Sequence, residues 1–145
     1  MAAPLASPTH YFELRFNAEA GRAYRLWIRG RADSNGWAND SVFVQFSGSV
    51  TSSGSSTWRI GTTSATEVNI EDCNGCGLAN WGWQDNGWGT NVLGPLVYFN
   101  TTGTHTIRVQ TREDGLAIDQ IVLSPETYRS TAPGALKNDT TILPR

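Results

Sequence analysis

Apolar and polar residues alternate with a period of two along much of this chain. The clearest runs are residues 11–16, 24–29, 41–46 and 104–110. In the first of them, Phe12, Leu14 and Phe16 fall on one face, and polar or charged residues fall on the other. A period of two is typical of a β-strand that buries one face. These four runs therefore predict strands of an antiparallel fold.

Shorter apolar runs and turn residues fill the intervals between these strands. Residues 58–60, 66–70 and 96–99 are shorter strand candidates, and residues 116–123 form a more continuously apolar last strand. Asn-Gly or Asp-Gly pairs at 35–36, 74–75, 86–87 and 114–115 mark turns. Short strands separated by such turns are typical of an antiparallel β-sandwich or barrel. The prediction is an all-β domain.

The pattern changes after Leu123. Ser124 and Pro125 end the last predicted strand, and Pro133, Gly134 and Pro144 follow in a segment without periodicity. We therefore expect a β-sandwich over residues 1–125 and an extended tail or linker over residues 126–145. A chain of 145 residues is long enough to form one such domain with a substantial core.

The stretch NWGWQDNGWG at residues 80–89 holds three of the six tryptophans. Tryptophan usually buries its ring in a core, whereas glycine, asparagine and aspartate keep a loop at the surface. Two interpretations follow. Either these rings close one end of the core, or they present aromatic faces to a ligand.

Charge and hydropathy exclude several partner classes. The net charge is −2 and the pI is about 5.6, with ten of the eleven cationic residues being arginine, and this mildly acidic balance leads us to expect no nucleic-acid binding. No apolar stretch approaches the ~20 residues of a membrane span, so we expect no membrane insertion. The first ten residues also lack the pattern of a signal peptide. If the protein is exported, its signal lies outside this chain.

Cys73 and Cys76 form the only cysteine pair, in the sequence CNGC. One CxxC without a second Cys or His pair is a poor structural zinc site, and no βαβ pattern supports a redox dithiol. The favoured interpretation is a local disulfide in an exported protein. Free thiols and a metal or redox role remain alternatives.

Three segments resemble carbohydrate-binding modules of the family 6 and family 35 type. They are AEAGRAYRLWIRGRA (18–32), NDSVFVQFSGSV (39–50) and VYFNTTGTHTIRVQTREDGLAIDQIVLSP (97–125), with a tryptophan-rich loop before the third. The resemblance implies a jelly-roll β-sandwich of the galactose-binding-domain-like class. It also implies a secreted or cell-surface module of a longer bacterial-type protein that binds an extracellular glycan.

The chain departs from that family in three ways. Such modules usually begin with further strands, often with acidic residues for a structural calcium ion, and this chain lacks them before Tyr11. The asparagine that often contacts sugar falls at Ala117 here. Three loop tryptophans also exceed the usual one or two. A sandwich without its first strands would leave an exposed edge.

The candidate ligand-binding residues combine aromatic faces with hydrogen-bonding groups. The aromatic candidates are Trp37, Trp81, Trp83 and Trp88, and the polar candidates are Asn39, Asp85, Asn86 and Glu113. Asp33 and Asp40, in the loop that carries Trp37, are weaker candidates for binding calcium, which prefers oxygen ligands. No other cofactor is expected.

Catalysis is not expected. The acids are scattered through turns, and no G-x-S-x-G or H-E-x-x-H motif is present. Non-catalytic glycan binding is therefore the leading hypothesis. The alternative is a structural or adhesive β-sandwich that self-assembles, or that completes its sheet with a strand from a partner or a neighbouring domain.

Overall fold

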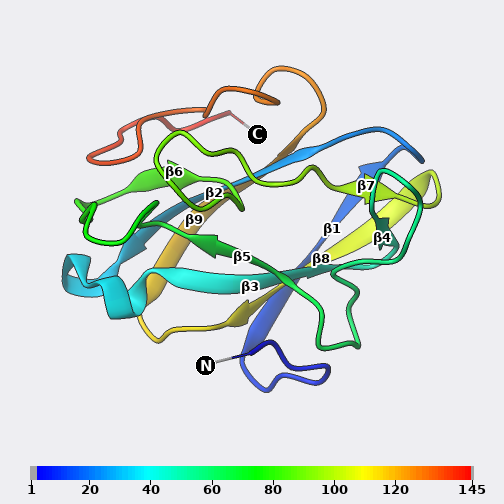
Figure 1. The fold of residues 1–145 in the computed structure, drawn as a ribbon, viewed down its shortest axis with the longest axis horizontal. Helices are drawn as coiled ribbons and strands as arrows, with labels where there is room; N and C mark the ends of the chain where they lie inside the picture. The colour runs from blue at the N-terminus through cyan, green and yellow to red at the C-terminus, as the bar shows by residue number, and fades with distance from the viewer. Residues whose placement is uncertain (1–2, 145) are drawn as a thin grey trace.

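The chain folds into nine β-strands and two 3₁₀ helices over residues 3–144, which are the residues that the computed structural model describes (Figure 1). Expectations about residues 1, 2 and 145 lie outside this range. The strands are β1 (Tyr11–Ala18), β2 (Arg25–Ala32), β3 (Ser41–Phe46), β4 (Ser49–Val50), β5 (Thr66–Asn69), β6 (Gly82–Gln84), β7 (Tyr98–Phe99), β8 (Gly103–Thr111) and β9 (Leu116–Ser124). The helices η1 (Asp33–Asn35) and η2 (Trp37–Asn39) follow β2.

The strands form antiparallel sheets, as the sequence predicts. One sheet has the order β1-β8-β3-β5, a second has the order β6-β2-β9, and β4 pairs with β7 in a small third sheet. The two larger sheets face each other across a common core. Leu26 and Ile28 of β2 meet Val44 and Phe46 of β3 in that core, and all four side chains are fully buried. The fold is therefore an all-β, sandwich-like domain.

The sequence periodicity locates most of the strands but not all of them. The runs at 11–16, 24–29, 41–46, 66–70, 104–110 and 116–123 all correspond to strands. Residues 58–60 form only an isolated bridge, because Trp58 adopts a positive φ of 47° that interrupts extended backbone. Conversely, β6 lies inside the tryptophan-rich stretch, where a loop is expected. Its pairing with β2 stabilises a strand too short to be recognised from its own pattern.

Residues 126–144 contain no helix or strand and lie against the outer face of the β6-β2-β9 sheet (Figure 1). Hydrogen bonds between the backbone of this segment and the rest of the domain hold it there, as three examples show. Trp83 N–H donates to the carbonyl of Ala135 (3.0 Å), Trp27 Nε1–H donates to that of Tyr128 (2.6 Å), and Asp139 N–H donates to that of Trp81 (2.8 Å). The segment therefore covers side chains that would otherwise face solvent.

A buried ion pair strengthens this contact. Arg29 Nε donates to Asp139 Oδ2 (2.7 Å), and the two side chains are only 4% and 2% exposed. Burial alone would raise the pKa of Asp139, but hydrogen bonds from Arg29, Ala135 N–H and Thr141 outweigh burial and lower it. The carboxylate thus stays ionised and holds the C-terminal segment against the sheet.

The two sheets leave one side of the sandwich open, between the edge strands β1 and β9. Phe12 and Leu14 of β1 are 42% and 48% exposed, although the alternation assigns them to a buried face. On the opposite sheet, Ile118 and Ile121 are only half-buried. No strand among residues 3–144 lies between β1 and β9, so the core opens to solvent along this side. We call this feature the open seam.

Among residues 3–144, no helix has the length and apolarity needed to cross a membrane.

Candidate functional site

Three connecting segments, residues 33–40, 71–80 and 112–115, gather at one end of the sandwich, which we call the loop end. A fourth segment, residues 85–94, begins at the other end of β2, where Asp85 pairs with Arg25, and reaches the loop end at Gly89. Asn80 N–H donates to Asn35 Oδ1 (2.7 Å), Gly89 N–H donates to the carbonyl of Asp72 (2.6 Å), and Asp40 N–H donates to Glu113 Oε2 (3.0 Å). These bonds join segments that are far apart in the sequence into one surface.

A polar hollow of about 450 Å³ lies at the loop end. Its lining includes Arg31, Asp33, Ser34, Asn35, Asn80 and Ala117. The guanidinium of Arg31 lies 5.3 Å from the ring centroid of Trp81, so a cation–π contact positions this arginine. The hollow offers charged, amide and hydroxyl groups, and no large apolar side chain lines it. This chemistry suits a polar ligand.

Trp37 is the most exposed tryptophan and lies in η2, two residues after Asn35 of the hollow. Its side chain is 74% exposed. Trp88 is also exposed, at 53%. A solvated indole ring loses the free energy that its burial would give, so neither ring serves the core of this chain. Both rings are free to stack on a ligand.

The side chains of the other two candidate tryptophans pack against other parts of the protein. Trp83 lies on β6 under the C-terminal segment and is 1% exposed, so no ligand can reach its faces in this conformation. Trp81 is half-buried, and Arg29 and Arg31 both lie over its ring at 4.9 and 5.3 Å. The two interpretations of the tryptophan-rich stretch therefore apply to different rings. Trp83 packs and Trp88 is displayed.

Asp85 and Asn86 are occupied by contacts within the protein. Asp85 is 1% exposed and pairs with Arg25 at 2.9 Å, in a second buried ion pair on the outer face of β2. It also accepts hydrogen bonds from the N–H groups of Gly87 and Gly94. The amide of Asn86 donates to Thr66 Oγ1 and to a backbone carbonyl. Both side chains shape the loop rather than face a ligand.

Glu113 lies against Asp40, and the two carboxyl groups form an acidic pair. Asp40 is 1% exposed, its Oδ2 accepts the N–H of Glu71 (3.0 Å), and its Oδ1 has no partner among residues 3–144. Burial raises the pKa of Asp40 to about 7, and the neighbouring Glu113 adds to the rise. Burial alone would also raise the pKa of Glu113, but hydrogen bonds from Ser41 and Asp40 lower it. Asp40 therefore holds a proton more readily than Glu113 does.

Asn39 supports the turn between β8 and β9. In the orientation that satisfies its amide, the side-chain nitrogen donates to the carbonyls of Asp114 and Ala38. Gly115 packs closely against the same side chain. Asn39 and Glu113 thus both join the segment at 33–40 to the turn at 112–115, and their polar atoms are largely engaged.

The calcium candidates differ in their exposure. Asp33 is exposed at the hollow, whereas Asp40 is buried behind it, so the two carboxylates face different environments. A further group of potential metal ligands comprises Asp72, Cys73 and Cys76, whose ligand atoms lie within 4.8 Å of one another. The two cysteines form a disulfide with a Cα–Cα distance of 5.3 Å. While this disulfide is closed, neither sulfur is a thiolate that could bind a metal.

The hollow contains groups that the sequence pattern did not indicate. Arg31 reads as an ordinary outward-facing strand residue, and Asn80 lies at the start of the tryptophan-rich stretch without any separate signal. Asn80 and Asn35 both have positive φ, at 53° and 51°. Asparagine adopts this conformation more readily than most residues. Only the fold shows that the two loops meet.

Comparison of the chain with models of protein families, with curated proteins and with solved structures finds no match in any of the three. The geometry of the loop end therefore provides the basis for a functional proposal.

Proposed function

We propose that this chain is a non-catalytic carbohydrate-binding module of the galactose-binding-like jelly-roll type, and that it binds glycan at the loop end. The observation that carries the proposal is Trp37, whose side chain is 74% exposed and which follows Asp33, Ser34 and Asn35, three residues that line the polar hollow of about 450 Å³. An exposed indole ring beside clustered polar groups is costly for a protein that uses neither, because the ring remains solvated.

The chemistry of the two features matches that of a sugar. A pyranose ring presents a flat patch of C–H groups, which stacks on an aromatic face, and a rim of hydroxyls that donate and accept hydrogen bonds. At the hollow, Asp33 accepts, Arg31 donates, and the amides of Asn35 and Asn80 can do both. A concave site with a few convergent polar groups is the usual form of a small-ligand site.

The proposed residues differ in part from those expected from the sequence. Trp37 remains the first aromatic platform, and Trp88 remains a secondary one outside the hollow. Trp83 and Asp85 are buried, so they contribute to the framework beneath the site. The hydrogen-bonding role moves from Asn86 and Glu113 to the groups that line the hollow.

The proposal also includes location and ion dependence. A disulfide in a surface loop suits an exported protein, and we therefore propose a secreted or cell-surface module. Asp33 at the hollow is the carboxylate that a glycan-bridging calcium ion would contact. We propose that binding be measured with and without calcium for this reason.

Calorimetric titration of the chain with purified polysaccharides and oligosaccharides tests the proposal. We expect saturable binding to at least one glycan, and we expect Trp37→Ala to weaken it by at least about tenfold, because the stacking face is lost. Trp88→Ala is the matched comparison, since it removes an equally large exposed ring from a segment that contributes no residue to the hollow, and it should weaken binding less. Asp33→Ala should weaken binding with little change in the unfolding midpoint, because the Asp33 side chain is exposed and has only a 3.5 Å contact with Ser34. Failure of every glycan to bind, or equal binding by Trp37→Ala, would refute the proposal.

A further inference from the structure

The outer edge of β1 carries backbone groups that no strand among residues 3–144 pairs with. β1 lies at the edge of its sheet and pairs only with β8. Thr111 N–H donates to the carbonyl of His10 (3.2 Å), so even-numbered residues of this strand exchange hydrogen bonds with β8. In an antiparallel ladder, the backbone N–H and C=O groups of the alternate residues point to the opposite edge of the strand. The N–H and C=O groups of Tyr11, Glu13, Arg15 and Asn17 therefore point away from β8.

Two opposite charges lie on that edge, two residues apart. Glu13 pairs with Arg108 of β8, and both guanidinium contacts go to Glu13 Oε1, at 2.7 and 2.8 Å. Glu13 Oε2 has no partner among the described residues. Arg15 is exposed and forms no ion pair or side-chain hydrogen bond within residues 3–144. Each charge thus retains capacity to bind a group outside the chain.

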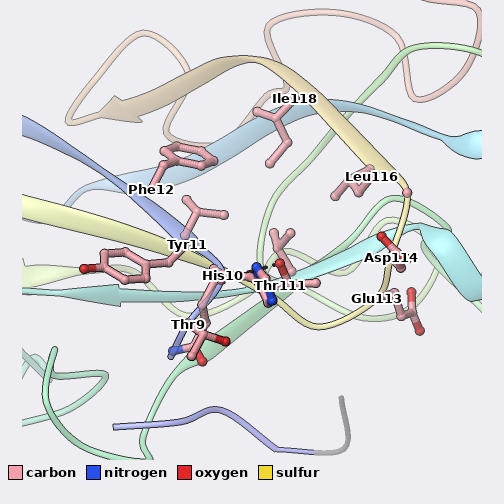
Figure 2. Close-up of a pocket in the computed structure, with 13 residues that line it drawn as sticks. Thr9, His10, Tyr11, Phe12, Thr111, Glu113, Asp114, Leu116 and Ile118 are labelled. Atoms are coloured by element: carbon pink, nitrogen blue, oxygen red, sulfur yellow. Dashed lines mark hydrogen bonds between the residues drawn. The ribbon is translucent and has the colours of Figure 1, made fainter. Parts of the chain in front are cut away.

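The other face of β1 is apolar and exposed. Phe12 and Leu14 are 42% and 48% exposed and line the open seam. Figure 2 shows Phe12 and Ile118 facing a common hollow of about 480 Å³, with Glu113 and Asp114 at one rim. A long edge strand with exposed apolar side chains is a template for pairing with another strand.

We propose that two copies of this chain pair through β1, antiparallel to each other about a twofold axis at Leu14. In this register Glu13 of one copy lies opposite Arg15 of its partner, and the same pair repeats across the axis. Tyr11 lies opposite Asn17. Glu13, Arg15, Tyr11 and Asn17 all carry edge-facing backbone groups, so each pair exchanges two backbone hydrogen bonds. A twofold interface of this kind is closed and self-complementary.

The charge pattern selects this register against its neighbours. The edge-facing groups are on odd-numbered residues, so the strand can shift only in steps that keep odd residues opposite odd residues. A shift by one such step places Glu13 opposite the Glu13 of the partner, and the opposite shift places Arg15 opposite Arg15. Like charges directly opposite each other are destabilising. Only the register centred on Leu14 pairs both charges favourably.

The apolar face supports the same arrangement. A twofold axis perpendicular to the sheet keeps Phe12 and Leu14 of both copies on one face of a continuous sheet. The Leu14 side chains then meet at the axis in a non-hydrogen-bonded pair, where side chains approach most closely. The two open seams come side by side, and their exposed apolar side chains become covered. This inference is independent of glycan binding, which uses the loop end.

Sedimentation equilibrium of the chain and of charge variants tests the proposal. We expect a monomer–dimer equilibrium for the natural sequence. Arg15→Glu should weaken dimerisation by about 10- to 100-fold, because it replaces two attractive cross-strand pairs with two repulsive ones. Glu13→Arg should act in the same way. An equimolar mixture of the two variants should form a heterodimer, since both acidic positions of one variant then lie opposite the basic positions of the other.

One control variant and one independent measurement keep the test specific. Arg129→Glu makes the same change of charge at an exposed residue of the C-terminal segment and should leave the dimer unchanged. Hydrogen exchange should show that the amides of Glu13 and Arg15 become protected as concentration rises. This measurement needs no variant, so it stands even if Glu13→Arg disturbs the contact with Arg108.

Several results would overturn the proposal. One is a monomer at all concentrations up to about 1 mM, which would place any dissociation constant above about 1 mM. Another is a dimer that Arg15→Glu does not weaken, or that Arg129→Glu weakens equally. A mixture of the two β1 variants that stays monomeric would also overturn it, as would protection confined to a surface other than β1.

Discussion

Substitution of Asp40 by asparagine should change how the stability of this protein depends on pH. Asp40 is 1% exposed and adjoins Glu113, and its pKa rises from 3.8 to about 7. The folded state therefore keeps a proton that the unfolded state releases above about pH 4. The stability that this proton gives is complete below about pH 4 and is lost as the pH rises through about 7.

The shift sets the size of the effect. The rise of about three units corresponds to an upper limit of about 4 kcal/mol, at about 1.4 kcal/mol per unit. Asp40 and Glu113 interact as they titrate, so only part of this limit belongs to Asp40, and we expect about 2 kcal/mol. The asparagine side chain would carry no charge at any pH, yet its amide keeps the oxygen that accepts the N–H of Glu71.

Urea unfolding followed by tryptophan fluorescence at about pH 4 to 8 measures this effect. Near pH 4 the natural protein and Asp40→Asn should be similarly stable. By about pH 8 the variant should be more stable by about 2 kcal/mol, because the natural protein then buries a charge next to Glu113. Asp33→Asn, at an exposed acid of the same loop, is the control and should follow the natural protein. If the difference between natural protein and Asp40→Asn does not vary with pH, the raised pKa is wrong.

Two further substitutions test contacts that depend on the fold. Asp139→Asn should lower the free energy of unfolding, measured in urea, by about 3 kcal/mol, because it leaves the buried Arg29 with an incomplete set of anionic partners. Unchanged stability would show that this ion pair does not anchor the C-terminal segment. Cys73→Ser should cost about 2 kcal/mol or less under oxidising conditions, since the loop that it closes to Cys76 is short; a loss of folding would contradict a local role for the disulfide.

Some residues of the candidate site could be identified from the sequence, and others could not. Trp37 and the polar residues after β2 stood out because an indole ring within a turn-forming segment is unusual. Asn80 lies 45 residues after Asn35, and no local pattern links the two. The hydrogen bond between Asp40 and Glu113 likewise spans 73 residues.

The outer face of β2 shows the same limit. Alternation places Arg25, Trp27 and Arg29 opposite the core, and such a face is normally solvated. In the structure all three are buried, because the C-terminal segment returns to cover them. Periodicity reports which side chains share a face of a strand, but it does not report what packs against that face.

The sequence by itself determined the all-β class, most of the strands and which side chains share a face of each strand, because the alternation of side chains along extended backbone is local. The tertiary structure alone decided which tryptophans are displayed, which arginines are buried and which strand edges remain unpaired. Those properties depend on contacts between residues tens of positions apart. Such contacts form only when the sheets pack and the C-terminal segment covers one of them.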